Sequence, residues 1–330
     1  MRRHRKIPLR KILYVGAFFA LLLVMLLSAV KILEATVLRG GEEGEAEYVS
    51  KTILRDGVEY FPRQDITVFL VLGIDRMGKV EQSDSYNNHG AADLAMLLVF
   101  DETEEELSVL HLNRDTMLTM PVIGIGGKQA GTYYGQLALA HTYGTGLKDS
   151  CENTKKAISD FLYGIRIDYY VSMNMDAIPI LNDAVGGVTV EVTEDFSAVD
   201  PSIGMGQVTL RGDQALNYVR TRKDVGDQLN LSRIQRQKQY LEAFAEAFRI
   251  RSKADGGLVS SCYHQVEDYL VSDCSVNSIT GMIERYEDYE ITRIVSPEGE
   301  NVLGEKYFEF YVDEDSLDSI LLQMFYAPKA

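Results

Sequence analysis

A run of 19 uncharged and mostly apolar residues, Ile12–Val30, constrains this chain more than any other feature. At about 1.5 Å per residue, a helix of this length spans roughly 30 Å, the hydrocarbon thickness of a bilayer. A buried core helix would show a polar face, which this run lacks, and a signal peptide usually has a shorter apolar core. We therefore expect one uncleaved transmembrane helix over residues 12–33.

Charge is distributed unevenly around this run. Residues 1–11 carry six Lys and Arg and no acid, so the positive-inside rule predicts a cytoplasmic N-terminus. The other 319 residues hold 27 basic and 49 acidic side chains. That balance excludes a general nucleic-acid binder, whose affinity comes mostly from neutralised phosphates. We expect a single-pass cell-membrane protein with a charged extracytoplasmic stalk over 34–64 and an extracytoplasmic C-terminal domain.

Apolar runs and amphipathic segments alternate after the stalk. Buried strands are predicted over 65–75, 93–101 and 107–115, and a glycine-rich loop over 121–132. The alternation indicates an α/β fold with a central mixed β-sheet flanked by helices. We predict one domain over 65–250. Residues 251–330 complete the same domain, because two strands and a helix rarely fold alone.

Three cysteines occur in the chain, Cys151, Cys262 and Cys274. An odd count argues against a disulfide framework. Cys262 and Cys274 are 12 residues apart, and an oxidising exterior would permit them to pair. Unpaired, partly buried thiols explain them equally well, so both possibilities stay open.

Charged side chains mark the ends of the predicted strands. Asp75 and Arg114 follow apolar runs, and Asp93 begins one. Ligand sites in open α/β sheets gather at strand ends. A guanidinium donates two parallel hydrogen bonds to a phosphate, and Mg²⁺ takes one or two carboxylates plus phosphate oxygens. From these residues alone, a structural ion pair explains Arg114 and Asp115 at least as well.

A second basic cluster lies in the segment "YVRTRKDVGDQLNLSRIQRQ". Arg220 and Arg222 are two residues apart, whereas Arg233 and Arg236 are three apart on a predicted helix. The second pair therefore projects from one helix face. The alternative is that Arg233 and Arg236 lie on a solvent-exposed face of the helix and balance the charge of its glutamates.

In their joint order these segments resemble the LytR-CpsA-Psr family, whose members are membrane-anchored enzymes of Gram-positive-type envelopes. The resemblance covers roughly residues 66–250. "VLGIDR" is similar to the family's Gly-x-Asp block, and Asp93 and Arg114 keep its spacing of 21 residues, with "RDT" intact. "LRGDQALNYVRTRK…SRIQRQ" resembles the final block, Leu-x-Gly-x-x-Ala-Leu-x-Tyr-x-Arg-x-Arg…Arg-x-x-Arg-Gln.

The chain departs from the family pattern in two places. Ala91 and Ala92 stand where the family has Arg-Ser before the aspartate, so one phosphate-binding arginine is missing. Asn113 stands where the family has proline. The segment "SDSYNNHG", just upstream of the alanines, is an unusual insertion.

The resemblance implies a transferase that attaches a polyprenyl-pyrophosphate-linked glycopolymer to peptidoglycan through a phosphodiester. The polymer would be teichoic acid, capsule or another wall glycan. Asp93 and Arg114 would be catalytic, and Asp75 and Asp93 would hold Mg²⁺ or Mn²⁺. The prenyl tail would lie in an apolar slot beside the strands at 66–72 and 168–173. The implied pyrophosphate ligands are Arg114, Arg220, Arg222, Arg233, Arg236 and Gln237.

Two other functions remain open at this point. The missing arginine fits a non-catalytic protein that binds polyprenyl phosphate or senses and regulates the envelope. A polyprenyl pyrophosphatase, which would release the lipid monophosphate without transfer, needs the same ligands.

Overall fold

The computed structural model describes residues 52–221, 223–226, 230–255, 257–274, 285–286, 289–305 and 307–329. They form two compact units, named here the sheet unit and the helical unit. Described residues of the sheet unit fall within 52–174, 270–274 and 289–329, and those of the helical unit within 175–269 and 285–286. The predicted tail and transmembrane helix lie outside the described residues. Within these ranges no helix has the length and apolarity that a membrane span requires.

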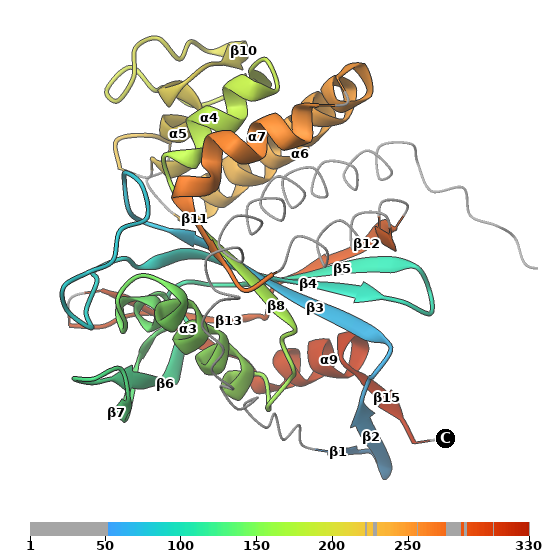
Figure 1. The fold of residues 1–330 in the computed structure, drawn as a ribbon. Helices are drawn as coiled ribbons and strands as arrows, with labels where there is room; N and C mark the ends of the chain where they lie inside the picture. Colours follow the sequence, from blue (N-terminus) through green and yellow to red (C-terminus); the bar gives the residue numbers. More distant parts are fainter. Residues whose placement is uncertain are drawn as a thin grey trace, which may run out of the picture. The chain divides into compact units, whose positions relative to one another are not determined.

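A six-stranded mixed sheet forms the centre of the sheet unit (Figure 1). Its strand order is β11-β8-β3-β4-β5-β12. The central strands β3, β4 and β5 are antiparallel, whereas β8 runs parallel to β3 and β12 parallel to β5. This arrangement confirms the predicted α/β class with a central mixed sheet. The strands are β3 (Ile66–Ile74), β4 (Ala92–Asp101), β5 (Glu106–Leu112), β8 (Tyr169–Asn174), β11 (Leu270–Ser272) and β12 (Glu290–Val295).

Three smaller sheets complete this unit. Residues 53–62, placed in the stalk by the sequence, form β1 and β2. The loop predicted over 121–132 was wrong, because β6 and β7 pair there as an antiparallel hairpin. Gly126 and Gly127 make the turn with positive φ, whereas Gly131 lies within β7 and pairs with Val122. The added strands are β1 (Ile53–Arg55), β2 (Val58–Pro62), β15 (Tyr326–Pro328), β6 (Met117–Ile123), β7 (Gln129–Gln136), β13 (Gly299–Leu303) and β14 (Phe308–Val312).

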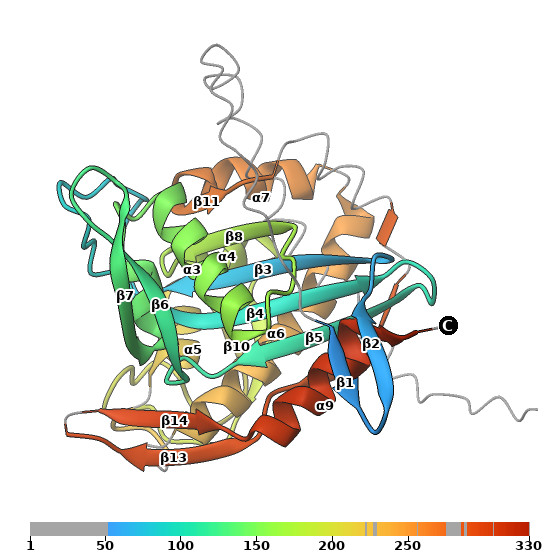
Figure 2. The ribbon, with the colours of Figure 1, turned by 90° about the horizontal axis from the view of Figure 1, so that it is seen from below.

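Helices α3 (Lys148–Phe161) and α9 (Glu314–Met324) and the 3-10 helix η2 (Leu137–Thr142) pack on one face of the sheet (Figures 1 and 2). Successive side chains of a strand point to opposite faces, so every second residue of β3 enters this layer. Those residues are Val68, Leu70, Leu72 and Ile74, all almost fully buried. They share one apolar cluster with Ile158 of α3 and Leu321 of α9. Each buried aliphatic side chain contributes about 1.5–3 kcal/mol to stability.

The helical unit combines helices with a two-stranded antiparallel sheet of β9 and β10, in which β9 packs against α6. Gly186 and Gly187 make the turn before β9, with φ values of 90° and 89°. A Cβ on Gly187 would come within 2.9 Å of the carbonyl oxygen of Leu210, so only glycine fits. The elements are α4 (Ala177–Ala184), β9 (Val188–Val192), β10 (Gly206–Leu210), α5 (Asp213–Arg220), α6 (Asn230–Ala254), α7 (Leu258–Val266) and η3 (Glu267–Tyr269).

All three cysteines are buried and free. The open question of a Cys262–Cys274 disulfide is therefore answered in favour of thiols. Burial raises the pKa of Cys262 to about 11 and that of Cys151 to about 12. Thiols held in this form are poor nucleophiles, because the thiolate is the reactive species.

The insertion upstream of β4 is fastened by one buried asparagine. Asn88 Nδ2 donates to the carbonyl oxygen of His141 at 2.7 Å and to Ser150 Oγ at 2.9 Å. Its Oδ1 accepts the N–H of Gly90 at 2.7 Å. This side chain thus ties the segment that leads into Asp93 to η2 and α3. His141 Nδ1, 2.9 Å from the carbonyl oxygen of Gly90, and the N–H of Asn88, which donates to the carbonyl oxygen of Thr142 at 3.0 Å, add to the link.

A buried ionic cluster joins α3 to β8 and β11. Lys155 Nζ lies 3.5 Å from Asp273 Oδ2 and 3.8 Å from Glu152 Oε2. Asp273 Oδ1 accepts the N–H of Tyr170 at 2.8 Å. Burial raises the pKa of Asp273 to about 6, against the opposing pull of that hydrogen bond and of the Lys155 charge.

We expect Asn88→Ala to lower the free energy of unfolding by about 2–3 kcal/mol, because several buried polar groups lose their partner at once. Urea denaturation of the full chain measures the change. The matched control is Asn87→Ala at the exposed neighbouring position, which should shift stability by less than about 0.5 kcal/mol. Equal effects of the two substitutions would contradict the fastening role.

We expect Asp273→Asn to flatten the pH dependence of stability between about pH 4 and pH 7. The raised pKa means that the folded state binds this proton more tightly than the unfolded state. Protonated Asp273 therefore contributes its full stabilisation of the fold below the ordinary pKa near 3.8, and this stabilisation is lost as pH rises through about 6. Wild type should lose about 2 kcal/mol more than the variant over this range. Parallel curves in denaturant titrations at each pH would refute the assignment.

Candidate functional site

Asp93 is the extra residue of a β-bulge at the end of the central sheet. The β3–β4 ladder pairs Gly73 with Leu94 and then Ile74 with Ala92, so the register shifts by one residue at Asp93. A bulge changes the direction in which the extra side chain points, and bulges often occur beside active sites. A Cβ on Gly73 would lie 3.0 Å from Leu94 Cβ. The glycine of "LGIDR" therefore lets the strands approach where the bulge forms.

Arg114 reaches Asp93 from the neighbouring strand. The β4–β5 register pairs Ala95 with Leu112, and continuing that register places Asp93 opposite Arg114. Arg114 Nη1 donates to Asp93 Oδ1, and its Nε lies 3.5 Å from Asp115 Oδ1. The three side chains are only 15–27% exposed. Screening by water is thus reduced, and the pair is held in one orientation.

A tight turn sets the direction of Arg114. Thr116 N–H donates to the carbonyl oxygen of Asn113 at 3.0 Å, which closes a β-turn over 113–116. Asn113 Oδ1 also accepts the N–H of Asp115 at 3.0 Å. This side-chain bond mimics a backbone turn, which explains how asparagine replaces the family's proline. The carbonyl oxygen of Arg114 accepts the N–H of Ala138 at 2.9 Å.

Asp75 lies at the same end of the sheet. It directly follows β3, its side chain is exposed, and its N–H donates to the carbonyl oxygen of Ala91 at 2.8 Å. Asp75 and Asp93 thus stand on adjacent strand ends. Two carboxylates are the number that Mg²⁺ commonly takes from a protein when phosphates and water supply its other ligands. The chemistry of this pair fits the predicted metal.

The basic residues of the second cluster belong to the helical unit. Arg220 ends α5 and is exposed, and Arg233 and Arg236 lie on α6. Arg233 is half-buried, whereas Arg236 is buried. Arg222 lies outside the described residues. The structure therefore groups Asp75, Asp93 and Arg114 in the sheet unit and the other described site residues in the helical unit.

Arg236 and Gln237 hold the C-terminal end of α5. Arg236 donates to the carbonyl oxygens of Tyr218, at 3.2 Å, and of Thr221. Gln237 Nε2 donates to the carbonyl oxygen of Val219 at 3.1 Å. The last carbonyls of a helix have no partner within the helix and need such donors. The Arg-Gln pair of the final motif thus fixes the backbone around Arg220.

The surroundings of Arg236 explain how a buried guanidinium is tolerated. Its Nε lies 3.0 Å from Glu194 Oε2, and its planar group is 5.2 Å from the ring centre of Phe196. A buried charge requires a paired charge and satisfied donors. In this conformation Arg236 is engaged within the helical unit, so the geometry gives it a positioning role.

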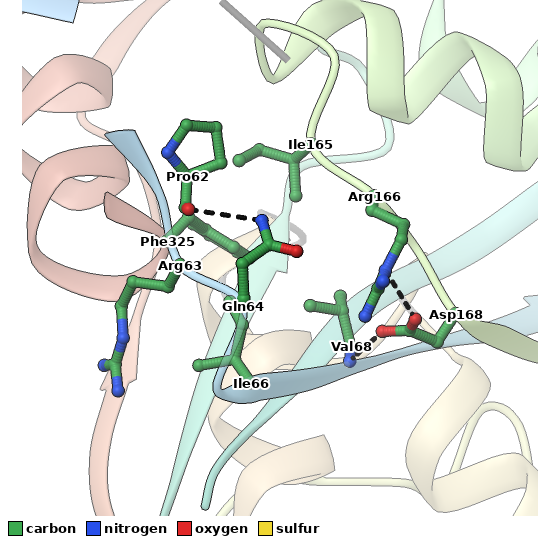
Figure 3. A pocket seen from close by; sticks show the side chains of 9 residues that line it. All are labelled: Pro62, Arg63, Gln64, Ile66, Val68, Ile165, Arg166, Asp168 and Phe325. Carbon is green, nitrogen blue, oxygen red and sulfur yellow. Dashed lines mark hydrogen bonds and ion pairs between the residues drawn. The ribbon is translucent and has the colours of Figure 1, made fainter. Parts of the chain in front are cut away.

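A polar cavity of about 240 Å³ lies at the other end of β3 (Figure 3). Arg63 and Arg166 line it, but both are paired with carboxylates. Arg63 Nη1 lies 2.6 Å from Asp101 Oδ2, and Arg166 Nε lies 2.7 Å from Asp168 Oδ1. The cavity is therefore distinct from the Asp93–Arg114 site.

The fold and the paired carboxylate and guanidinium define an α/β protein with a charged candidate site at one end of its central sheet. The model of the LytR_cpsA_psr family matches residues 41–325, and the chain belongs to this family. The resemblance expected from the motifs is thereby confirmed.

Curated relatives and solved structures agree with this membership. The chain is 31% identical over 194 residues to a polyisoprenyl-teichoic acid–peptidoglycan teichoic acid transferase TagU of Halalkalibacterium halodurans, covering 58% of this chain and 57% of that protein. The matched part spans about half the length of the curated relatives, 52–57% in three of them.

Two crystal structures share the fold. TagV of Bacillus subtilis superposes with a TM-score of 0.58 at 22% identity, over 79% of this chain and 96% of that one. TagT bound to LI-WTA superposes with a TM-score of 0.56 at 23% identity, over 86% and 98%.

Three contributors to the site were missed from the sequence. Asn113 makes the turn, Gln136 donates to Asp115 Oδ1 at 2.9 Å, and Glu194 pairs with Arg236. Asn before a turn is a recognisable signal. Gln136 and Glu194 carry no local signal, because both act across long sequence separations.

We expect Arg236→Lys to loosen the end of α5. Lysine keeps the charge but cannot reproduce the planar fork that serves two carbonyls and Glu194 together. Stability of the full chain should fall by about 2 kcal/mol, and hydrogen exchange of the last α5 amides should accelerate. The control is Gln235→Ala at an exposed position of α6. Unchanged exchange in the arginine variant would rule out the positioning role.

Proposed function

We propose that this protein transfers a glycopolymer from a polyisoprenyl pyrophosphate to peptidoglycan. The observation that carries the proposal is the fixed Asp93–Arg114 pair beside Asp75 at one end of the sheet. Family membership supports it, as do the relatives named teichoic acid transferases and the TagT structure bound to LI-WTA. Teichoic acid is the polymer that these relatives favour.

In this proposal the ligands of the diphosphate are the arginines that the family motifs imply. They are Arg114, Arg220, Arg222 and Arg233. Arginine suits this role because its fork matches phosphate oxygens and stays charged at any working pH. Arg236 and Gln237 hold the backbone that presents Arg220, as their contacts with the α5 carbonyls support.

The reaction is a phosphoryl transfer. An acceptor hydroxyl oxygen of peptidoglycan forms a bond to the phosphorus that carries the polymer. The bond from that phosphorus to the bridging oxygen breaks, and polyisoprenyl monophosphate leaves with the electron pair. The hydroxyl proton passes to a carboxylate, and we assign this role to Asp93. Positioning and charge neutralisation supply most of the rate in such reactions.

A bound magnesium ion would act beside the arginines, held by the acids of the site. Asp75 and Asp93 would hold the ion, which when bound supplies positive charge to the phosphate oxygens. Without a cation, the three carboxylates of Asp75, Asp93 and Asp115 outnumber the guanidinium groups of Arg76 and Arg114 and weaken the attraction for a diphosphate. Mn²⁺ has the same ligand preferences.

We also propose that residues 12–33 anchor the protein in the cell membrane, with the described residues on the outer side. The apolar run and the preceding basic residues support this placement. A lipid-linked donor would then be met at the membrane surface. The apolar slot for its tail stays a proposal as well.

We expect Arg114→Ala to lower transfer by a factor of about 10²–10³, the size measured when one transition-state donor is removed elsewhere. The assay follows release of polyisoprenyl monophosphate from a lipid-linked polymer with peptidoglycan present. Arg166→Ala is the matched control, since Arg166 is paired with Asp168 at the far end of the sheet unit.

Each alternative function predicts a different product pattern. Tight lipid binding without turnover in wild type would indicate a sensing protein and not a transferase. Ala91 and Ala92, which stand in place of the family's Arg-Ser, are the reason to consider this function. Monophosphate release that does not require peptidoglycan would indicate a pyrophosphatase. Wild-type activity in Arg114→Ala would contradict the site itself.

A further inference from the structure

Two hairpins of the sheet unit carry exposed aromatic side chains next to the candidate site. They are β6–β7 and β13–β14, which lie close together at one end of the unit (Figure 2). Tyr134 is 54% exposed and Tyr311 is 41% exposed. We name these two residues, with Glu309, the aromatic platform. Clustered aromatic exposure of this kind usually marks a binding surface.

Strand alternation explains why these rings face solvent. In β6–β7 the buried Leu118 and Met120 point inwards, whereas Tyr134 stands opposite the exposed Thr119 on the outer face. In β14 the ring of Phe310 is buried, so its neighbour Tyr311 projects to the other side. The outward tyrosines are thus not part of the core of the unit.

The platform is continuous with the Arg114 turn. Gln136 Nε2 donates to Asp115 Oδ1 at 2.9 Å and to the carbonyl oxygen of Phe308 at 2.8 Å. The N–H of Phe310 donates to the carbonyl oxygen of Asp115 at 2.9 Å. Asp115 in turn lies beside the Arg114 guanidinium. A molecule bound on the rings would therefore lie next to the end of the sheet that carries Arg114.

The charge of these strands selects the kind of occupant. The four strands contain no Lys or Arg, and their two acids are Glu300 and Glu309. Tyr311 Oη donates to Glu309 Oε2 at 2.6 Å, and Glu300 stands opposite Tyr311 in the ladder. Such a surface repels polyanions, including a phosphate-rich polymer. It suits neutral, hydroxyl-rich ligands, whose C–H faces cover aromatic rings and whose hydroxyls donate to carboxylates.

We propose that the aromatic platform binds the acceptor, a neutral glycan strand of peptidoglycan, and delivers its hydroxyl to the Asp93–Arg114 site. This inference rests on the proposed function, because it names where the second substrate lies. Tyr134 and Tyr311 stack on sugar rings, and Glu309 accepts sugar hydroxyls. Gln136 couples the platform to Asp115, so the acceptor-binding surface and the arginine keep a fixed relation.

The test measures binding of neutral glycan strands, β-1,4-linked oligomers of N-acetylglucosamine that carry no lactyl carboxylates, to the full chain in detergent. The variant Tyr134→Ala/Tyr311→Ala should bind these strands at least about tenfold more weakly, as expected when stacking aromatics at a binding surface are removed. Tyr134→Phe keeps the ring and should retain most of the affinity. Phe61→Ala, at an exposed aromatic of β2, is the matched control and should leave affinity unchanged.

Two further measurements separate this inference from the proposed function. Tyrosine-dependent strand binding without any polymer transfer would uphold the platform and refute the transferase. Transfer with unchanged strand affinity in the double alanine variant would uphold the transferase and refute the platform. If the double variant instead loses affinity for free teichoic acid polymer, the platform holds the donor and the proposal is overturned.

Discussion

The ion pair between Asp93 and Arg114 is the interaction on which the site depends. It exists because a bulge turns Asp93 out of the β3 ladder while the β4–β5 register brings Arg114 opposite. Both features belong to the rigid central sheet. The pair therefore gains its orientation from backbone hydrogen bonds, and the turn at Asn113 adds to them.

A second constraint concerns the buried charge of the helical unit. Arg236 is tolerated because Glu194, two ring faces and the α5 carbonyls surround it. The next residue of the motif, Gln237, donates a hydrogen bond to one further carbonyl oxygen of α5. A motif that resembles a set of ligand-binding residues thus also contains residues that hold the neighbouring backbone in place.

The sequence predicted the central sheet and the site at its end for identifiable reasons. β3, β4 and β5 are long apolar runs, and the spacing of 21 residues between Asp93 and Arg114 is the register of a hairpin. The β6–β7 hairpin was missed because its glycines suggested a loop, although alternating residues on both sides form a ladder. The engagement of Arg236 was also missed, because Glu194 lies far from it in sequence and pairing across such distances leaves no local pattern.

A double-mutant cycle on lipid binding tests the central claim most directly. Affinity for a polyisoprenyl pyrophosphate is measured for wild type, Asp93→Asn, Arg114→Lys and the double variant. If the pair acts as one unit, each single change weakens binding, and the double variant binds no worse than Arg114→Lys, with a coupling above about 1 kcal/mol. Fully additive losses, or unchanged affinity in the double variant, would contradict the account.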